Sequence, residues 1–512
     1  MIGSDQPSLP DQPALPDQPE LPELADLVDG AWTPSDAPLG FDLEDPATGA
    51  VRRPAAGTPP DRIEAAVAAA SAVHEAGSWA ALPAPARADV LDGVAEAVEG
   101  VAAEICALES VTTGVPIRQT TPLGVILGGA FRLAAAQLRQ GPQSQEFHRE
   151  DGRIVHAERL PWGPAACVVP WNAPAPMAAH KVANALAAGC PTILKPSEYA
   201  PHGSQRLAAV IGAALAAAYA PAGVFQLVHG GAEAGAALVG DPRIRAVSFT
   251  GGLAAGRAVA TACAYDIKPV QLELGGNNPL VVLPDADVAD VARAAVDLLS
   301  TLNGQWCRAL GRLIVPADRH DEIVGAIADR LADLVAGAPL DPATDLGPLV
   351  HSRHLARVVA ARDDLLAHGG TAVTGTTLPV NGPLAGGNFL APTLVTGVAA
   401  THTEDEIFGP VAAVHPYATV DEAVALANGT PYGLEAYVLG ADEEAALAVA
   451  RRIRAGEVKV NGSSVLSLHL FSPRPAFGLS GYGEEGTAET LRFFTNPRVV
   501  GVEGGFALHS RL

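Results

Sequence analysis

The 512-residue chain has little methionine, little cysteine and no long apolar run. It contains 2 methionines and 5 cysteines, at Cys106, Cys167, Cys190, Cys263 and Cys307. The number of cysteines is odd, none forms a CxxC pair, and the chain starts with no recognisable signal peptide. We therefore expect a reduced cytoplasmic protein without a zinc or other metal site. No uninterrupted apolar stretch reaches the roughly 18–20 residues of a membrane span, so we expect no membrane partner.

Basic residues are also scarce beside acidic ones. The chain has 33 lysines and arginines against 56 aspartates and glutamates, a net charge of −23. This negative charge argues against nucleic acid or an anionic membrane as a partner. Since 48% of the residues are hydrophobic, the chain can bury a large core, and its length predicts two or at most three domains.

The start of the chain and two later segments differ from the rest. Residues 1–25 repeat a Leu-Pro-Asp-Gln-Pro theme and predict a solvated tail; a recruitment role for it is the alternative. Polar residues 144–160 predict a projecting hairpin, with arms Gln145–Glu150 and Arg153–Arg159 around a two-residue Asp151-Gly152 turn. Residues Phe494–Val502 predict a terminal strand.

Helices and strands alternate in the remainder. A helix is predicted from an N-cap at Thr58 to Gly77, and a second from Ala84 to Glu109. Apolar strands separated by alanine-rich helical stretches are predicted at Ala165–Val169, Thr192–Lys195, Val224–Val228, Ala246–Phe249 and Val270–Leu274. This alternation predicts a parallel, doubly wound α/β sheet, although no GxGxxG fingerprint follows any strand. A second α/β region, with strands near Leu280–Leu283 and Arg312–Val315, runs from about Asn277 to Arg474.

Two residues are candidates for covalent chemistry. Cys307 lies in Gly-Gln-Trp-Cys, just after an apolar helix predicted at Val288–Leu302. A cysteine there is either a small buried hydrophobe or a nucleophile. Glu273 ends an apolar strand and precedes two glycines, a position that fits either a structural salt bridge or a carboxylate in a cleft.

Polar motifs follow the other predicted strands. The amide of Asn172, in Pro170-Trp171-Asn172, is suited to hold an oxyanion. Lys195 and Glu198, in Lys-Pro-Ser-Glu, stand where such a sheet receives a ribose. The turn Phe249-Thr250-Gly251-Gly252 opens a helix whose free N–H groups suit a pyrophosphate.

Together these motifs resemble the aldehyde dehydrogenase superfamily of NAD(P)-dependent, non-phosphorylating enzymes. PWN, KPSE, FTGG, ELGG, GQWC and the later Glu406-Ile407-Phe408-Gly409-Pro410-Val411 occur in the family's order, and the resemblance runs from Val28 to the end. It implies a Rossmann-like NAD-binding domain (26–143 and 161–275), an α/β catalytic domain (276–490) and a small β oligomerisation element (144–160 and 491–512).

The resemblance also implies residue roles. Cys307 matches the nucleophile, Glu273 the general base, Asn172 the oxyanion amide and Lys181 the proton-relay lysine. The implied reaction oxidises an aldehyde to a carboxylic acid through a Cys307 thiohemiacetal and thioester. The expected cofactor contacts are Val169, Pro170, Trp171, Lys195, Glu198, Gly230, Phe249, Gly251, Gly252, Leu274, Glu406 and Phe408.

Three departures from the family pattern stand out. Gly252 replaces the usual serine, and Asn277 the usual lysine. The segment Pro475–Gly486 lacks the usual lysine and arginine, after a longer loop at Gly462–Arg474. The predicted substrate pocket comprises Trp306, Arg308, Leu466, His469 and Phe471. Trp306 favours an apolar or aromatic aldehyde; Arg308 either recruits a carboxylate or pairs on the surface.

The resemblance also bears on the cofactor, the product and the assembly of the protein. Glu198 favours NAD because its charge repels a 2′-phosphate, and NADP remains possible. A CoA-acylating enzyme is one alternative, which Glu273 disfavours, and a decayed cofactor-binding protein is another. The polar hairpin and terminal strand predict a homodimer or homotetramer through edge pairing.

Overall fold

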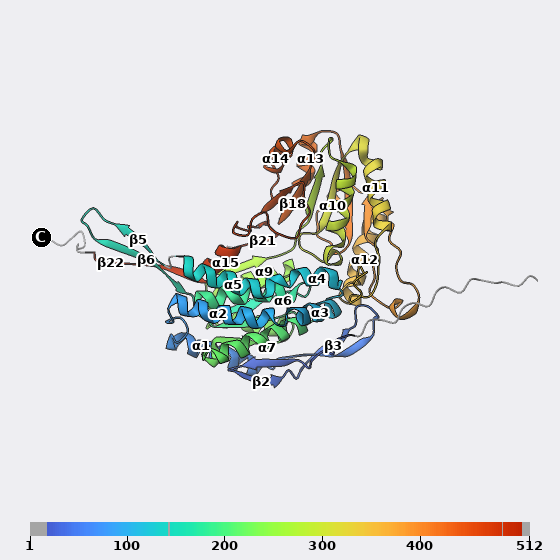
Figure 1. Ribbon diagram of the computed structural model, residues 1–512. Coiled ribbons are helices and arrows are strands. Elements are labelled where there is room, and N and C mark those ends of the chain that lie inside the picture. Colours follow the sequence, from blue (N-terminus) through green and yellow to red (C-terminus); the bar gives the residue numbers. More distant parts are fainter. Residues whose placement is uncertain (1–17, 142–143, 484, 504–512) are drawn as a thin grey trace, which may run out of the picture.

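The described residues form two α/β units and a projecting arm (Figure 1). The computed structural model describes residues 18–141, 144–483 and 485–503. Residues 1–17 of the predicted tail lie outside this range. Within residues 18–25 the prediction of a solvated tail is wrong, because Leu21 and Leu24 are buried.

The first unit is built on an eight-stranded sheet with the order β2-β1-β9-β8-β7-β10-β11-β21. Its strands are β1 (Ala25–Val28), β2 (Ala31–Pro34), β7 (Ala165–Val168), β8 (Thr192–Lys195), β9 (Phe225–Leu227), β10 (Ala246–Thr250), β11 (Val270–Glu273) and β21 (Gly481–Tyr482). The five strands from β9 to β11 run parallel, as predicted, because they are buried on both faces and joined by helices. β21 pairs antiparallel with β11, so a segment near the end of the chain completes this sheet.

Helices cover both faces of the first sheet. The helices of this unit are α1 (Pro60–Ala76), α2 (Ala84–Glu99), α3 (Ala102–Thr113), α4 (Ile117–Leu123), α5 (Val125–Gln140), α6 (Pro174–Ala188), α7 (His202–Ala217), α8 (Ala232–Gly240), α9 (Leu253–Tyr265) and α15 (Thr487–Phe493). Helices α2, α3, α5, α6 and α7 pack in one core, and α1, α8 and α9 pack in the other. The sheet is therefore doubly wound.

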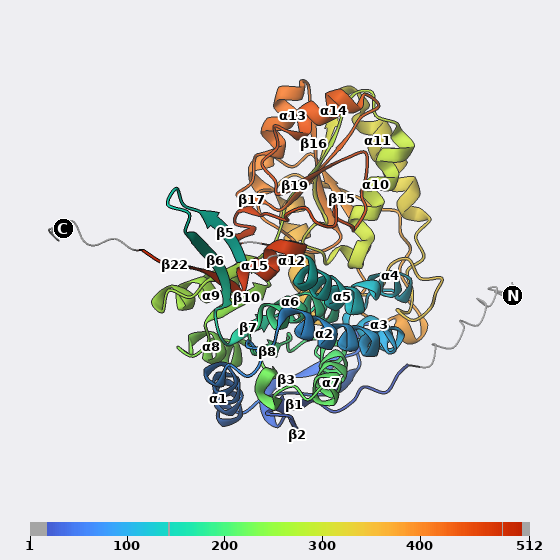
Figure 2. The same cartoon turned by 60° about the vertical axis from the view of Figure 1, so that its left-hand side comes forward.

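The second unit has a seven-stranded sheet with the order β14-β15-β16-β13-β12-β18-β19. Its strands are β12 (Asn278–Val282), β13 (Leu310–Pro316), β14 (Thr371–Val373), β15 (Thr393–Thr396), β16 (Val411–Tyr417), β18 (Glu435–Leu439) and β19 (Glu457–Val460). Its helices are α10 (Val288–Ser300), α11 (His320–Ala332), α12 (Ser352–Ala367), α13 (Val420–Ala427) and α14 (Glu443–Ala450). Figure 2 shows this unit above the first one, with its sheet between helix layers.

The arm is a three-stranded antiparallel sheet that extends away from both units (Figures 1 and 2). It contains β5 (Ser144–His148), β6 (Ile154–Pro161) and β22 (Thr495–Gly501), in the order β22-β6-β5. The projecting hairpin and the terminal strand are thus present. The turn is wider than predicted, because the last β5–β6 pair is His148 with Ile154 and five residues separate them. Two short ribbons complete the fold, β3 (Ala37–Glu44) with β4 (Val51–Gly57) and β17 (Tyr432–Gly433) with β20 (Phe477–Gly478).

Three helix predictions are wrong in detail. Thr58 does not cap α1; its hydroxyl instead donates to Asp26 Oδ1 at 2.6 Å. The helix predicted from Ala84 to Glu109 breaks at Gly100 and Val101, because glycine and a β-branched residue interrupt it. The helix predicted at Val288–Leu302 ends at Ser300, since Leu302 takes a left-handed backbone conformation.

One segment is long and apolar enough to cross a membrane by composition. It spans Ile117–Gln140, the helices α4 and α5. In this structure α5 packs on α2 and α6, and Leu127, Phe131 and Leu138 are buried in the first unit's core.

Candidate active site

The predicted site residues gather at the carboxyl ends of the parallel strands of the first sheet. Asn172 follows β7, Lys195 ends β8, Gly251 follows β10 and Glu273 ends β11. Parallel strands place these ends on one edge, which is where sheets of this kind bind ligands. Cys307 comes from the second unit, in the connection between α10 and β13. The site therefore lies where the two units meet.

A strained turn presents Cys307. Leu302, Asn303 and Gly304 have φ angles of 50°, 58° and 71°, the left-handed region that non-glycine residues rarely adopt. The amide of Asn303 donates to the carbonyls of Gly114 and Pro348, each at 2.9 Å, and these bonds hold the turn. Strain supported in this way is typical of functional sites because it fixes a reactive side chain.

Asn172 is tied to the same loop. Its Nδ2 atom donates to the carbonyl oxygen of Gln305 at 2.9 Å, two residues before the nucleophile candidate. An amide nitrogen has two N–H donors, so this bond leaves one for an oxyanion beside Cys307. The structure therefore ties Asn172 to the loop that carries Cys307.

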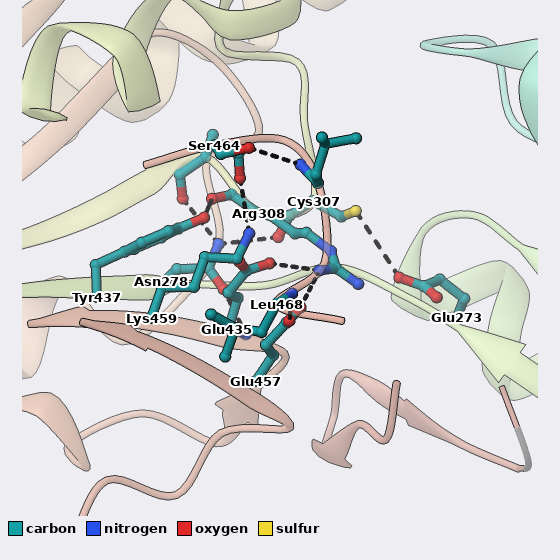
Figure 3. Close-up of polar contacts among 12 residues, drawn as sticks. Glu273, Asn278, Cys307, Arg308, Glu435, Tyr437, Glu457, Lys459, Ser464 and Leu468 are labelled. Atoms are coloured by element: carbon teal, nitrogen blue, oxygen red, sulfur yellow. Dashed lines mark hydrogen bonds and ion pairs between the residues drawn. The ribbon is translucent and has the colours of Figure 1, made fainter. Parts of the chain in front are cut away.

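Cys307 and Glu273 are in contact across the two units. The Cys307 Sγ atom lies 3.9 Å from the Glu273 Oε1 atom, with the thiol as donor (Figure 3). Burial and the neighbouring Glu273 raise the pKa of the Cys307 thiol well above its usual value, against the opposing charge of Arg308. The resting thiol is therefore protonated and needs a base to react.

A second carboxyl group adjoins Glu273. Burial and a hydrogen bond with Glu485 raise the pKa of Glu273 well above the usual value for a glutamate. Although burial opposes it, the hydrogen bond from Glu273 and the charge of Lys181 lower the pKa of Glu485. The two carboxyls thus share a proton, and a raised pKa makes ionised Glu273 a stronger base.

Lys181 lies behind this carboxyl pair. It is buried on α6, and its Nζ atom donates to Ser248 Oγ at 2.7 Å. Ser248 donates in turn to Gln271 Oε1 at 2.6 Å, on the strand that carries Glu273. Burial lowers the pKa of Lys181, while the nearby Glu485 carboxylate acts to raise it. A buried polar chain therefore runs from Lys181 to Gln271, which lies two residues before Glu273 on the same strand.

Glu406 closes the opposite side of the site. Its Oε1 atom accepts a hydrogen bond from the Gly276 N–H at 2.8 Å. A Cβ atom on Gly275 would overlap the Glu406 carboxylate, so the glycine gives this carboxylate its present position. Glu406 and Phe408 border a cavity of about 170 Å³, which Trp306 and Gly304 also line.

Phe408 is held in place by its backbone and by Trp171. It has a φ angle of 57°, and its carbonyl lies 3.0 Å from His354 Nε2. The rings of Trp171 and Phe408 meet edge to face with centroids 5.4 Å apart. Two expected cofactor contacts, Trp171 from the first unit and Phe408 from the second, therefore pack against each other.

The remaining expected cofactor contacts lie along the first sheet. Lys195 is buried and donates to the Pro196 carbonyl at 3.3 Å, while Glu198 is half-buried and accepts from Ser197 at 3.3 Å. Val169 donates its N–H to the Lys195 carbonyl at 3.1 Å. The other contacts lie at or just beyond the strand ends or at their turns: Pro170, Gly230, Phe249, Gly251, Gly252 and Leu274.

The predicted substrate residues separate into three groups. Trp306 packs against the core of the second unit. Arg308 is paired, but in the interior and not on the surface: its Nη1 atom lies 2.7 Å from Glu435 and 2.9 Å from Glu457. Leu466, His469 and Phe471 lie on the loop that follows β19.

Sequence reasoning missed several residues of the site. Glu485 contacts Glu273 although it is distant in sequence. Glu435, Glu457 and Lys459 surround Arg308. The sequence did contain a signal for these residues, because charges of opposite sign stand in the buried strands. Such charges are costly to bury unless they are paired. Within residues 18–141, 144–483 and 485–503, no group of three histidine, cysteine or acidic side chains is placed to hold a metal ion.

Comparison with known proteins gives a separate line of evidence. The model of the aldehyde dehydrogenase family matches residues 32–500. The 2-hydroxymuconic semialdehyde dehydrogenase of Pseudomonas sp. (strain CF600) is 34% identical over 480 residues, covering 91% of this chain and 97% of its own. The non-phosphorylating aspartate-semialdehyde dehydrogenase of Halomonas elongata is 34% identical over 479 residues, covering 90% of this chain and 91% of its own.

A solved structure shows the same fold with ligands. Aldehyde dehydrogenase C from Pseudomonas syringae, crystallised with NAD+ and octanal, has a TM-score of 0.85 and 32% identity, covering 93% of this chain and 96% of its own. The chain therefore belongs to the aldehyde dehydrogenase family and catalyses the NAD-dependent oxidation of an aldehyde to a carboxylic acid through a catalytic cysteine.

Proposed function

We propose that Cys307 is the nucleophile, Glu273 the general base and Asn172 the oxyanion donor of this reaction. The observation that carries the assignment is the 3.9 Å contact between Cys307 Sγ and Glu273 Oε1. The bond from Asn172 to Gln305 adds a fixed donor next to the nucleophile. A thiol, a base and an oxyanion donor are the three groups that covalent aldehyde chemistry needs.

The chain's own residues account for the proton movements and for the covalent bond to the substrate. Ionised Glu273 takes the thiol proton, and the Cys307 sulfur forms a bond to the aldehyde carbon. Asn172 and the Cys307 backbone N–H stabilise the resulting oxyanion. NAD, when bound, supplies the acceptor for the hydride that leaves this carbon. Glu273 then removes a proton from water, which attacks the thioester, and the C–S bond breaks to release the acid and the thiolate.

The proton that Glu273 collects needs an exit. Glu485 shares a hydrogen bond with it, and buried Lys181 lies on the far side of this pair. We assign Lys181 to the path by which this proton leaves the site. The lowered pKa of Lys181, caused by burial, eases proton exchange through it.

The residues at the strand ends fit NAD. Glu406 projects a carboxylate into the cavity against Gly275 and Gly276, as an acceptor for ribose hydroxyls. The free N–H groups at the start of α9 suit a pyrophosphate, with Gly252 as the cap residue. Glu198 supports NAD over NADP because a half-buried carboxylate repels a 2′-phosphate.

The entrance supports an uncharged, apolar aldehyde as the substrate. Arg308 follows the nucleophile in sequence and already pairs with two carboxylates, so its own guanidinium is not free to bind a substrate carboxylate. The loop after β19 exposes apolar side chains, with Leu466 and Leu468 each 65% exposed. An apolar rim attracts an apolar substrate because contact removes its surface from water.

The assay for this function is NADH formation at about 340 nm with aliphatic, aromatic and carboxylated aldehydes. Rapid turnover of uncharged aldehydes with release of free acid is the expected result. If a thioester product appeared, and only when coenzyme A was added, transfer of the acyl group to coenzyme A would replace hydrolysis in the proposed reaction. NAD binding without turnover of any aldehyde would contradict the catalytic assignment.

The arm supports assembly into a homodimer or homotetramer, in a cytoplasmic protein with five unpaired cysteines. Within the described residues, the outer edges of β22 and β19 have no strand partner. Val499, 69% exposed on β22, adds apolar surface that a second copy would cover. Light scattering at micromolar concentration should give a multiple of 52.1 kDa, and a mass near 52.1 kDa would exclude this assembly.

A further inference from the structure

Four charged side chains form a buried cluster beside the nucleophile. The buried ionic cluster consists of Arg308, Glu435, Glu457 and Lys459, none of which is more than 9% exposed. Lys459 Nζ lies 2.5 Å from Glu435 Oε1, and Arg308 Nη1 lies 2.7 Å from Glu435 Oε2 and 2.9 Å from Glu457 Oε2. Two positive and two negative charges therefore cancel, which is the condition under which such charges tolerate burial.

The cluster holds the first part of the loop Gly462–Arg474. Glu457 Oε1 accepts from the Leu468 N–H at 2.6 Å, and Lys459 Nζ donates to the Ser464 carbonyl at 2.7 Å. Figure 3 shows these bonds beside Cys307, with the Arg308 guanidinium among them. This part of the loop is therefore anchored to the residue that follows the nucleophile.

The second part of the loop is anchored on the other side of the site. Thr487 Oγ1 donates to the Leu470 carbonyl at 2.5 Å, and the Arg474 N–H donates to the Glu485 carbonyl at 2.8 Å. Glu485 contacts Glu273, as described above. The loop thus runs from the neighbour of Cys307 to the neighbour of Glu273 and is anchored on both sides of the catalytic pair.

Glu457 links two features of this entrance. One oxygen of its carboxylate pairs with Arg308, and the other orders the exposed apolar loop. We propose that Glu457 is a specificity-determining positioning residue, which neutralises Arg308 and holds the loop so that the enzyme selects uncharged aldehydes against carboxylated ones. This inference rests on the proposed site and adds the reason for its preference.

The physical argument concerns the cost of desolvating a second anion. A carboxylated aldehyde at Cys307 would lose hydration and meet a cluster whose cations already have partners. The exposed side chains of Leu466 and Leu468 on the same loop offer no hydrogen bond to a carboxylate. Selection against the charged substrate therefore comes from an unpaired charge in the complex, not from a steric block.

The test compares two aldehydes of equal length, butanal and 4-oxobutanoate, with kcat and KM measured separately. The kcat/KM of the parent should be at least about tenfold higher for butanal than for 4-oxobutanoate. A factor of this size corresponds to the free energy of one ion pair. Glu457→Gln keeps an oxygen for the Leu468 N–H but removes the charge next to Arg308. It should lower KM for 4-oxobutanoate about tenfold relative to butanal, with kcat for butanal within about twofold of the parent.

Matched variants separate charge from loop anchoring. Glu457→Asp keeps the charge and shortens the reach, so it should raise KM for both aldehydes and leave their ratio unchanged. The exposed Glu443→Gln removes one charge far from the cluster and should change neither value. Adding Arg308→Met to Glu457→Gln should abolish the gain for 4-oxobutanoate.

Two results would overturn the inference. One is a parent that prefers 4-oxobutanoate, a measurement that needs no variant to fold. The other is a folded, NAD-binding Glu457→Gln enzyme whose ratio stays that of the parent. A parent that oxidises neither aldehyde nor any other would instead contradict the proposed function.

Discussion

Cys307 Sγ and Glu273 Oε1 lie 3.9 Å apart, although the first belongs to one α/β unit and the second to the other. Glu273 ends a strand of the eight-stranded sheet, and Cys307 precedes a strand of the seven-stranded one. The contact therefore depends on how the two units pack together. A change that shifts one unit against the other separates the nucleophile from its base.

Cys307→Ala should abolish turnover and leave NAD binding intact, because it removes the nucleophile but no expected cofactor contact. NADH production and calorimetric NAD affinity give the two readouts. Cys263→Ala is a matched control: that cysteine is buried in α9, away from the carboxyl pair, so its loss should preserve activity. If Cys307→Ala still formed acid, another residue would have to be the nucleophile.

Glu273→Gln should give a burst of NADH that is slower than in the parent, because an amide cannot take the Cys307 thiol proton, and this burst should be followed by still slower steady-state turnover. An amide cannot take a proton from water, so the thioester should accumulate, and we expect deacylation to slow by about 10²–10⁴-fold. Stopped-flow absorbance separates the two phases. If steady turnover matched the parent, another residue would have to activate the water.

NAD affinity should fall as the pH drops below 7. Burial raises the pKa of Glu406 to about 7, against the opposing Gly276 hydrogen bond and Arg357. Above this pH the carboxylate is charged and accepts ribose hydroxyls; below it the group is protonated and accepts them less well. The dissociation constant from calorimetry should rise by up to about tenfold per pH unit below 7.

The control for this pH dependence is Glu406→Gln, which cannot ionise. Its NAD affinity should be weaker than that of the parent at pH 8 and nearly constant from pH 6 to 8. An equal slope in both proteins would assign the titration to another group.

Glu109→Gln should stabilise the protein increasingly as pH rises. Burial raises the pKa of Glu109 to about 8, although the Ala175 N–H bond acts to lower it. Between about 4.3 and 8 the folded state therefore binds a proton that the unfolded state lacks, and stability falls with pH by up to about 1.4 kcal/mol per unit. Glutamine cannot ionise and escapes this loss.

Thermal unfolding from pH 5 to 8 tests the Glu109 prediction. The difference in melting temperature between Glu109→Gln and the parent should grow with pH, whereas the exposed Glu75→Gln should show a constant difference. A difference independent of pH would mean that Glu109 stays charged in the folded state.

The parallel strands were predictable because each is a fully buried apolar run bounded by turn residues. β8 matches its predicted limits, Thr192–Lys195, and the polar motifs at the strand ends gather on one edge as parallel topology requires. The strands β1 to β4 were not predicted. β2 is fully exposed and β3 is mostly half-buried, and neither offers a strong apolar signal.

The contacts between distant segments were beyond sequence reasoning. Glu485 stands in a segment noted for its missing basic residues, and only folding shows that it meets Glu273. Arg308 had two readings, substrate recognition or a surface pair. The interior pair with Glu435 and Glu457 needed knowledge of where β18 and β19 lie relative to Cys307.

The pairing of β11 with β21 makes the strand that carries Glu273 depend on a segment translated much later. Glu273 is opposite Gly481, whose φ angle of 120° and close approach to the Leu272 carbonyl leave no space for a Cβ atom. The first unit can collapse early around its helices, but its sheet edge stays open until this late segment emerges from the ribosome. A nascent chain without this segment lacks both the strand partner of Glu273 and the Glu485 carboxyl that contacts it.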